Sequence, residues 1–372
     1  MLDLSIYEEN EIEIFVKKYY DHVKPVALYG NGRGLSWYLS CLQSYNITPE
    51  LIIDGNVQGI DSQIVIEGYR VISLEAAKTI CNNWYIVISA PAHYKVIEQI
   101  ISNEFEKCEA ILFEPVLEVF QGIRAKDRRD YYRLHKKEIE TTYESLADDY
   151  SRYTFEKVLQ GALTSDCKCY EDIANKYQYF PDCVLNRLMD NEIFVDLGAF
   201  TGDSIEELIE AANDHFTKIY AFEPIIENIE GGKNRIKDDR VKWFQCAVGE
   251  KRGTMSIVTT GGLDEAAHLN ESSCDEGVAV EVYPLDAFEF PKVTYIKMDI
   301  EGAEVSALRG AQKTIEENTP IMAISIYHRI DDYWIIPQYI KNLNLGYELY
   351  VRHYWKCTGT DTVLFAIPKS RR

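Results

Sequence analysis

The sequence has no apolar stretch that approaches the roughly 18 residues needed to span a membrane. Residues 1–4 lack the basic start and apolar centre of a signal peptide, so a cytoplasmic protein is expected. The nine cysteines are odd in number and show no paired CxxC spacing, which favours reduced thiols over disulfides or zinc ligands. We therefore predict no structural metal.

Positive charge is also scarce, and the formal net charge of −21 repels phosphate backbones. General nucleic-acid binding is therefore not expected. One segment reverses the sign locally, and its basic residues are Arg124, Lys126, Arg128, Arg129, Arg133, Lys136 and Lys137. Two interpretations stay open for it: a solvated helical face that joins two domains, or a contact for a diphosphate or an anionic glycan.

The sequence does contain an alternation of strand and helix patterns, and this alternation occurs twice. Its 372 residues and 46% apolar composition allow a sizeable core and suggest two α/β domains. The pattern in residues 1–117 predicts a Rossmann-like parallel sheet. Residues 118–190 are charged, tyrosine-rich and helical in period, and we interpret them as a helical connector. Residues 191–372 repeat the α/β pattern and end in a hairpin, which predicts a mostly parallel sheet with an antiparallel edge strand.

Each predicted domain has a glycine loop between a strand and a helix. In the first domain the glycines are Gly30, Gly32 and Gly34, one residue short of the GxGxxG spacing. Asp54 follows at the distance where an acid would meet a ribose. A nucleotide or nucleotide-sugar could bind there, and a loop that serves oligomerisation or domain docking is the alternative.

In the second domain, Asp196, Gly198 and Gly202 give a wider D-x-G-x-x-x-G turn, and Glu223 ends the next predicted strand. Bare backbone at the glycines permits close approach of a ligand. Carboxylates accept hydrogen bonds from amines and hydroxyls but repel phosphate. S-adenosylmethionine has such an amino group and ribose hydroxyls, so we predict that this loop binds it and that Glu223 accepts from both hydroxyls.

Together with KMDIEGAE at residues 297–304, these loops resemble the FkbM family of S-adenosylmethionine-dependent methyltransferases. The resemblance covers about residues 179–367, where YFPD, IFVDLGAFTGDS, IYAFEP, CAVGEKRG, YPLDAF, YIKMDIEGAE, LRGA and DTVLFAIP follow the family's order. It implies a class I methyltransferase sheet of seven strands and methyl transfer, usually to oxygen. ISIYHR and YVRHY are similar to the branch associated with bacterial surface glycans. Leu197 departs from relatives that often have a second glycine in this loop.

The resemblance also implies a set of cofactor contacts. These are Asp196, Gly198, Gly202, Ser204, Glu223, Pro224, Ala247 and Asp299. In this scheme Asp196 and the two glycines would hold the methionine end and Glu223 the ribose. Ala247 would lie near the adenine, and Asp299 would face the reaction centre. The first domain is more loosely similar to small nucleotide-binding folds attached to glycan-modifying enzymes.

A sugar hydroxyl is a poor nucleophile at neutral pH, so a base within hydrogen-bond reach would help methyl transfer. His328 is our first candidate, because it follows a predicted strand at the sheet edge that Glu223 and Asp299 share and because imidazole titrates near neutrality. Packing of the ring against Tyr327 or Trp334 is the alternative.

Asp299, Glu301 and Glu304 form a carboxylate cluster in the sequence. We count Asp299 and Glu301, with His328, as candidate catalytic residues. The cluster could instead bind a divalent cation or cap the next helix. His353, in YVRHY, is expected to pack or to support the site.

The segment 259–277 is longer than an ordinary connection between strands. It is a candidate lid hinged at Gly261 and Gly262, and plain surface disorder is the alternative. Its polar residues that could reach cofactor or sugar are His268, Asn270, Ser272 and Ser273. Separately, Ser204 with Glu207 fits a capping box at a helix start.

The sequence therefore predicts an S-adenosylmethionine-dependent enzyme that methylates a sugar hydroxyl of a nucleotide-sugar or a surface glycan precursor in polysaccharide biosynthesis. Two alternatives stay open: an NAD-dependent nucleotide-sugar oxidoreductase that uses the first glycine loop, and a non-catalytic binding or assembly subunit. A homo-oligomer is compatible with the sequence.

Overall fold

The computed structural model describes residues 4, 7–32, 34–57, 64–259, 267–270 and 278–371, with the side chains of 258–259 and 267–270 left out. Backbone contacts divide the chain into two compact units. The first contains Met1–Lys136, Glu156–Ile173 and Trp355–Thr360, and the second contains Lys137–Phe155, Ala174–Tyr354 and Asp361–Arg372. Both units include part of the segment 118–190, and the three-part division expected from sequence stays a prediction. Among the described helices, none combines the length and apolar composition of a membrane span.

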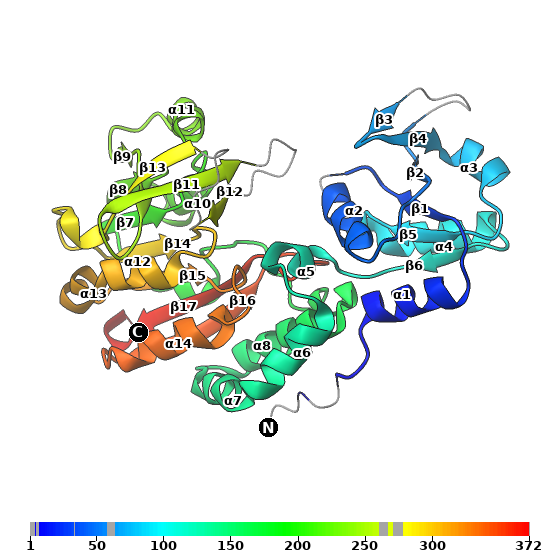
Figure 1. The fold of residues 1–372 in the computed structure, drawn as a ribbon. Coiled ribbons are helices and arrows are strands. Elements are labelled where there is room, and N and C mark those ends of the chain that lie inside the picture. The colour runs from blue at the N-terminus through cyan, green and yellow to red at the C-terminus, as the bar shows by residue number, and fades with distance from the viewer. Residues whose placement is uncertain are drawn as a thin grey trace. The chain divides into compact units, whose positions relative to one another are not determined.

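The first unit holds a six-stranded sheet with helices on both faces (Figure 1). Its strands are β1 (Val26–Tyr29), β2 (Leu51–Asp54), β3 (Val65–Ile66), β4 (Tyr69–Ser73), β5 (Tyr85–Ile88) and β6 (Glu109–Ile111). Its helices are α1 (Glu11–Asp21), α2 (Leu35–Ser44), α3 (Leu74–Ile80), α4 (Tyr94–Glu104), α5 (Val116–Gln121) and α6 (Ala125–Leu134). The strand order is β3-β4-β2-β1-β5-β6, and β3 with β4 is the antiparallel pair. This is the Rossmann-like sheet that the sequence predicts.

Alternating side chains along β1 explain why this sheet is covered on both faces. Val26 and Leu28 pack into one core cluster with α1 and α2, whereas Ala27 and Tyr29 pack into another with α3 and α4. All four side chains are buried. A continuous apolar run of this kind is typical of a parallel strand with helices on both sides.

The second unit contains two sheets, and α7 and α8 contain residues of both units. The helices are α7 (Lys136–Ser145), α8 (Asp149–Thr164), α9 (Asp182–Leu185), α10 (Asp203–Ala211), α11 (Ile226–Arg235), α12 (Glu304–Gly310), α13 (Gln312–Asn318) and α14 (Asp332–Asn342). The strands are β7 (Glu192–Leu197), β8 (Phe216–Phe222), β9 (Val241–Phe244), β10 (Ala247–Val248), β11 (Gly253–Thr259), β12 (Ala267–Asn270), β13 (Val278–Tyr283), β14 (Tyr295–Met298), β15 (Ile321–Ser325), β16 (Tyr347–His353) and β17 (Thr362–Pro368).

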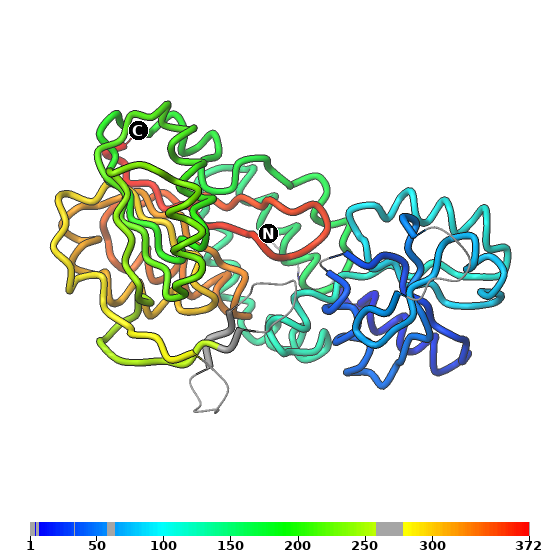
Figure 2. The backbone as a smooth tube through the Cα atoms, turned by 90° about the horizontal axis from the view of Figure 1, so that it is seen from above, coloured from blue at the N-terminus to red at the C-terminus, as the bar shows by residue number. Residues whose placement is uncertain are grey.

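The larger sheet has seven strands in the order β16-β17-β15-β14-β7-β8-β9. The strands from β15 to β9 pair in parallel, whereas β17 is antiparallel to both β15 and β16. The final hairpin expected from sequence is present, and its second strand lies one place in from the edge of the sheet. Figure 2 shows these strands side by side, from the green strands to the red hairpin.

One face of this sheet is packed by aromatic side chains. Phe194 on β7 and Tyr295 on β14 have ring centroids 5.2 Å apart, and Phe180 stacks on Tyr295 at 5.5 Å. Ile205 and other residues of α9 and α10 join the same core cluster. This packing holds β7 and β14 against α9 and α10.

A second, four-stranded sheet has the order β10-β13-β11-β12. The strand patterns in the sequence do not distinguish its strands from those of the larger sheet. The expected lid at 259–277 falls mainly on residues outside the described part of the chain. Within that segment, the backbone of residues 267–270 forms β12, which pairs with β11 in antiparallel fashion.

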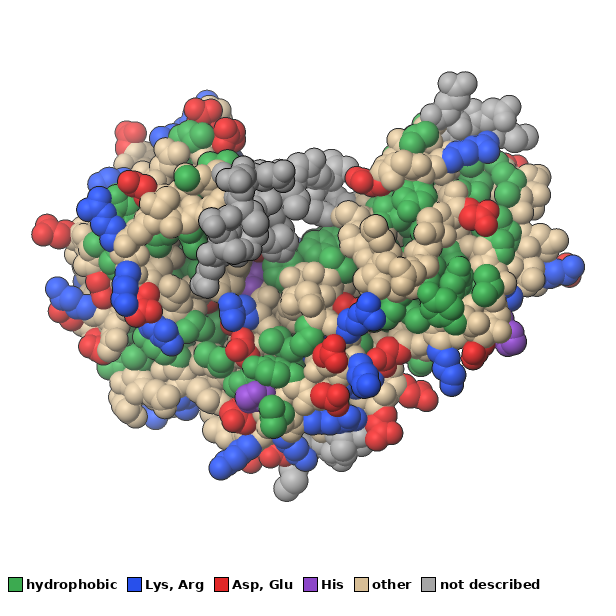
Figure 3. Space-filling model, in the orientation of Figure 1, with side chains coloured by type: hydrophobic (Ala, Val, Ile, Leu, Met, Phe, Trp, Pro, Cys, Tyr) green, Lys and Arg blue, Asp and Glu red, His purple; other side chains and the backbone are tan. Residues whose placement is uncertain are grey.

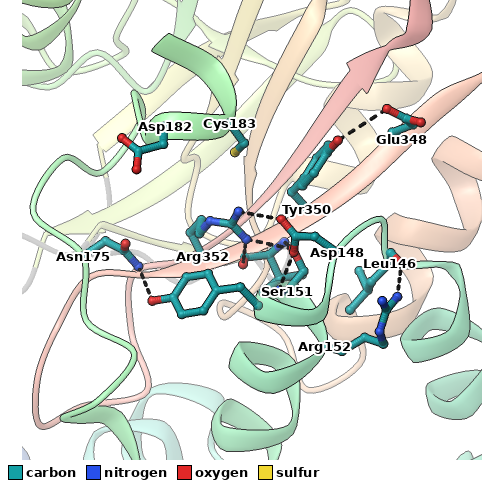
Figure 4. Close-up of polar contacts among 12 residues, drawn as sticks. Leu146, Asp148, Ser151, Arg152, Asn175, Asp182, Cys183, Glu348, Tyr350 and Arg352 are labelled. Atoms are coloured by element: carbon teal, nitrogen blue, oxygen red, sulfur yellow. Dashed lines mark hydrogen bonds and ion pairs between the residues drawn. The ribbon is translucent and has the colours of Figure 1, made fainter. Parts of the chain in front are cut away.

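The YVRHY motif at the end of β16 has a structural role (Figure 4). Arg352 donates to Asp148 at 2.9 Å and to Ser151 at 2.8 Å, which joins β16 to the start of α8. His353 is fully buried, and its Nδ1 lies 2.9 Å from the Thr362 hydroxyl across the hairpin. The expectation that His353 packs rather than reacts agrees with this geometry.

Candidate active site

A cavity of about 450 Å³ opens at the carboxyl ends of the central strands of the seven-stranded sheet. Gly198 follows β7, Glu223 follows β8 and Asp299 follows β14, and all three line the cavity. The strand order reverses here, because β8 lies on one side of β7 and β14 on the other. Open α/β sheets bind ligands at such a switch point, so chain topology places this cavity.

Gly198 begins the glycine loop with a left-handed φ of 82°. A Cβ atom here would lie 1.9 Å from the carbonyl oxygen of Asp299, so only glycine lets the ends of β7 and β14 approach this closely. Gly202 has a φ of 83° and precedes α10 without lining the cavity. Of the two predicted glycines, Gly198 therefore faces the cavity and Gly202 shapes the turn behind it.

Glu223 is buried at the cavity wall and is held rigidly by hydrogen bonds. Its carboxylate accepts from the backbone N–H of Phe200 at 3.1 Å and of Ile225 at 2.9 Å, and from the Asn228 amide at 3.2 Å. Burial raises the pKa of Glu223, and these donors offset part of that rise. A carboxylate has about four acceptor positions, so one is left for a direct ribose hydroxyl. The neighbouring Asn228 side chain is the partner available to the second hydroxyl.

Asp196 does not line the cavity, contrary to the prediction that it holds the cofactor amine. Its side chain is fully buried, accepts from the Ser204 hydroxyl and lies 3.1 Å from the Lys297 ammonium. Burial raises the pKa of Asp196, and Lys297 and Ser204 counter that rise. Ser204 lies inside α10, so its predicted capping box with Glu207 is wrong: the hydroxyl is used to support Asp196 instead.

Lys297 is the site residue that sequence analysis missed. It lines the cavity from β14, donates to the Gly198 carbonyl oxygen at 2.5 Å, and is only 3% exposed. Burial alone would lower the pKa of Lys297. The carboxylates of Asp196 and Asp299 raise it by more, so the pKa lies above its ordinary value. The sequence offered one signal for this role: Lys297 lies two residues before Asp299, within a run that is otherwise apolar and predicted to be a buried strand.

Apolar residues also line the cavity and form its apolar wall. Its residues are Phe222, Pro224, Ile225, Cys246, Ala247, Val248, Met255 and Ile257. Pro224 and Ala247 were expected at the ribose and adenine side, and both lie on this wall, next to Glu223. An apolar wall beside a fixed carboxylate suits a flat base attached to a ribose.

Asp299 forms the acidic side of the cavity. Its carboxylate accepts from the hydroxyls of Tyr179 at 2.7 Å and Tyr327 at 3.3 Å. Burial alone would raise the pKa of Asp299, but Lys297, His328 and Tyr179 lower it overall. Asp299 is therefore a fixed anion rather than a proton acceptor.

Glu301 also lines the cavity and differs from Asp299 in its proton affinity. Burial raises the pKa of Glu301 to about 7, with His328 opposing the rise and Asp299, Glu304 and Asp361 adding to it. The backbone of Glu301 is left-handed with a φ of 55°, an uncommon conformation for a residue with a side chain. Such strained positions concentrate at functional sites.

His328 does not line the cavity, and it is the main correction to the predicted catalytic set. Its Nδ1 lies 2.8 Å from Glu304, and its Nε2 lies 3.4 Å from Asp299 and 3.6 Å from Glu301. Burial lowers the pKa of His328, but the three carboxylates raise it to about 10. The ring is a buried cation at neutral pH, so it supports the carboxylates and is not the base.

Ligand atoms of Asp299, Glu304 and His328 lie within 4.8 Å of one another, as in a metal site. A metal needs a neutral imidazole, whereas the surrounding carboxylates keep this ring protonated. We therefore interpret the group as an ion-pair cluster, and the absence of a bound metal stays a prediction.

The glycine loop of the first unit has a local structural explanation. Gly30 has a φ of 116°, and a Cβ there would lie 2.7 Å from Ala90. Asp54 is buried and accepts from the backbone N–H of Asn56 at 2.6 Å, which stabilises a turn. Nucleotide binding at this loop stays a prediction.

The basic segment is partly structural. Arg128 is buried and donates to the Ala162 carbonyl at 2.9 Å, and Arg129 pairs with Glu13 at 2.5 Å. On the face drawn in Figure 3, Lys and Arg side chains are interspersed with acidic ones rather than gathered in one patch. The segment therefore does not present all its charges as one solvated face.

The strand order, the glycine loop after β7 and the acid after β8 define a class I methyltransferase fold. Residues 196–349 match the model of the methyltransferase FkbM domain. Residues 196–349 are therefore an FkbM methyltransferase domain, and S-adenosylmethionine is the cofactor of such a domain. No curated protein sequence matches the chain.

Solved structures were compared with this chain, and one of them shares its fold over most of its length. The crystal structure of an FkbM methyltransferase from Methylobacillus flagellatus has a TM-score of 0.75 and 24% identity, and the match covers 95% of this chain and 92% of that one. An SAH-bound methyltransferase from Podospora anserina has a TM-score of 0.32 and 12% identity, over 64% of this chain and 96% of its own. That second likeness is too weak to support any inference.

The cavity fits the cofactor that the family uses. Glu223 and Asn228 would hold the ribose, the apolar wall with Ala247 the adenine, and the region of Gly198 the methionine end. The carboxylate of Asp299 would complement the positive charge of the sulfonium. When bound, the cofactor supplies a methyl group on a sulfur that is already a good leaving group.

Gly198→Ala tests the close approach of β7 and β14. We expect strain of about 1–2 kcal/mol from the left-handed backbone and about 1–3 kcal/mol from the added Cβ, with loss of S-adenosylhomocysteine binding. Urea unfolding and calorimetric titration measure the two effects. Gly346→Ala is the matched control, because Gly346 has a φ of 75° with open space around it. Equal losses in both variants would contradict the role of the close contact.

Glu223→Gln tests the ribose contact. We expect S-adenosylhomocysteine to bind about 10- to 100-fold more weakly, since a hydrogen bond to a charged group contributes about 1.5–3 kcal/mol. Calorimetric titration measures the change. Glu227→Gln, on the exposed side of α11, should bind like the unaltered protein, and an unaltered affinity in Glu223→Gln would exclude the contact.

Proposed function

We propose that this methyltransferase methylates a hydroxyl oxygen of a sugar, in a nucleotide-sugar or a surface glycan precursor. The observation that supports this most is Glu301, a cavity-lining carboxylate whose pKa is raised to about 7. A base is most effective when its pKa lies near the working pH. A sugar hydroxyl needs such a base, whereas a neutral amine can attack without one.

In the proposed reaction Glu301 accepts the hydroxyl proton as the acceptor oxygen attacks the methyl carbon. Asp299, held by Tyr179 and Tyr327, stays charged and orients the acceptor from the side. Alignment of oxygen, carbon and sulfur contributes the larger part of the rate, with up to roughly 7 kcal/mol from positioning. His328 provides the buried positive charge that keeps three carboxylates close together without repulsion.

The charge of the cavity supports a neutral acceptor group near the reacting atom. The acidic residues that line it are Asp203, Glu223, Asp299, Glu301 and Asp361, and Lys297 is the one basic side chain among the described lining residues. An anionic acceptor would meet this negative field, so phosphates of a nucleotide-sugar would have to dock outside the cavity. The oxidoreductase alternative uses the glycine loop of the first unit, and it stays a prediction for that unit. Cytoplasmic location, polysaccharide biosynthesis and homo-oligomerisation remain part of the proposal.

The position of the new methyl group tests the proposal directly. We expect incubation with methyl-labelled S-adenosylmethionine and a panel of neutral nucleotide-sugars to give a methyl ether, which is stable to base and assignable by NMR. A base-labile methyl ester or an N-methyl product would contradict it. Cofactor binding without transfer to any panel member would favour the non-catalytic alternative.

Glu301→Gln tests the base. As a base Glu301 must be unprotonated, so we expect kcat/KM to fall about tenfold for each pH unit below about 7. We expect the variant to lose about 10²- to 10⁴-fold in rate and to lose this acid limb, with S-adenosylhomocysteine binding retained. The control is Glu317→Gln on α13. An acid limb that persists in Glu301→Gln would assign the base elsewhere.

A further inference from the structure

The methionine end of S-adenosylmethionine carries a carboxylate as well as an ammonium group, and a cavity lined by five acidic side chains must hold that anion somewhere. The glycine loop is the expected place, but four of its amides already have partners. The N–H groups of Gly198 and Ala199 donate to the Phe222 carbonyl, that of Phe200 to Glu223, and that of Gly202 to Ala199. These four amides therefore do not provide an anion site.

The neutral side-chain donors on the cavity wall bring no positive charge, and each already has a carboxylate partner. Gln178 donates to Asp361 at 2.8 Å, Tyr179 to Asp299 at 2.7 Å, and Asn228 to Glu223 at 3.2 Å. Each of these donors already serves a carboxylate of the protein. Among the described lining residues, a full positive charge remains at Lys297 alone.

The ammonium of Lys297 has three N–H donors. One is directed to the Gly198 carbonyl oxygen at 2.5 Å and one to Asp196 at 3.1 Å. The Tyr179 ring centroid lies 5.1 Å away, which is a weaker contact than a carboxylate would offer. One donor is thus left on a buried ammonium at the cavity wall, beside the loop where the methionine end belongs.

We infer that Lys297 binds the carboxylate of the cofactor's methionine end. Asp196 is then a positioning residue for Lys297. The two residues are partners in the register of β7 and β14, and Ser204 holds the Asp196 carboxylate in place. Lys297 is a binding residue for the cofactor, and the Asp196 pairing that the sequence suggested for the cofactor amine is made to Lys297 instead. This inference rests on the cofactor assignment and not on the identity of the acceptor.

The competing partner for the carboxylate is the start of α10, where backbone N–H groups favour anions. Asp203 stands in the first turn of α10 and lines the cavity. Its negative charge opposes a second anion at that helix start. The test below separates these two partners.

The test compares three ligands by calorimetric titration: S-adenosylhomocysteine, its decarboxylated analogue, and 5′-methylthioadenosine, which lacks the whole amino-acid end. With the unaltered protein, we expect S-adenosylhomocysteine to bind about 10- to 100-fold tighter than the decarboxylated analogue. In Lys297→Met this ratio should fall to near one, while the affinity for 5′-methylthioadenosine is unchanged. A purely structural role for Lys297 would weaken all three ligands together.

Lys297→Met leaves Asp196 buried without its cation, so the double variant Lys297→Met with Asp196→Asn keeps the test valid if the single variant unfolds. In the double variant the ratio should again be near one. Lys297→Arg retains the charge and should retain part of the ratio. A ratio that persists in the double variant would overturn the inference and assign the carboxylate to the start of α10.

Discussion

The site depends on one buried ion pair between adjacent strands. Asp196 of β7 and Lys297 of β14 are partners in the sheet register, and their charged groups lie 3.1 Å apart with almost no exposure to solvent. Burying two charges is costly unless each is paired and hydrogen-bonded, and here Ser204 and the Gly198 carbonyl complete the set. The pair fixes the ends of both strands at the switch point, where Gly198 must approach the neighbouring backbone.

Three carboxylates that line the same cavity differ in hydrogen bonding and in proton affinity, because their surroundings differ. Glu223 is held by backbone donors, Asp299 is kept charged by cations and tyrosine hydroxyls, and Glu301 has its proton affinity raised by burial. His328 reduces the repulsion among the acids of this region, because its imidazolium lies near three carboxylates at once. Environment rather than residue type thus divides the roles of binding, orientation and proton transfer among like side chains.

The sequence allowed the fold and the location of the site to be predicted, because strand and helix periods, glycine spacing and the acid after β8 are local signals. Gly198, Glu223, Pro224, Ala247, Asp299 and Glu301 all line the cavity. The direction of the Asp196 side chain could not be predicted, since it depends on Lys297, which becomes its neighbour only through strand pairing. The charge of His328 could not be predicted either, because Glu304 reaches it from a separate helix. The four-stranded sheet was missed because alternation along one strand does not reveal which strand it pairs with.

The first unit is built from three separate segments of the chain. Its sheet and helices come from the first third, part of α8 follows, and Trp355–Thr360 comes from the turn between β16 and β17. Within that turn Cys357 is buried and contacts the Pro91 carbonyl at 3.3 Å. A nascent chain cannot complete this unit before β16 of the other unit has been translated. The two units consequently mature together, and no single cut in the chain yields either of them whole.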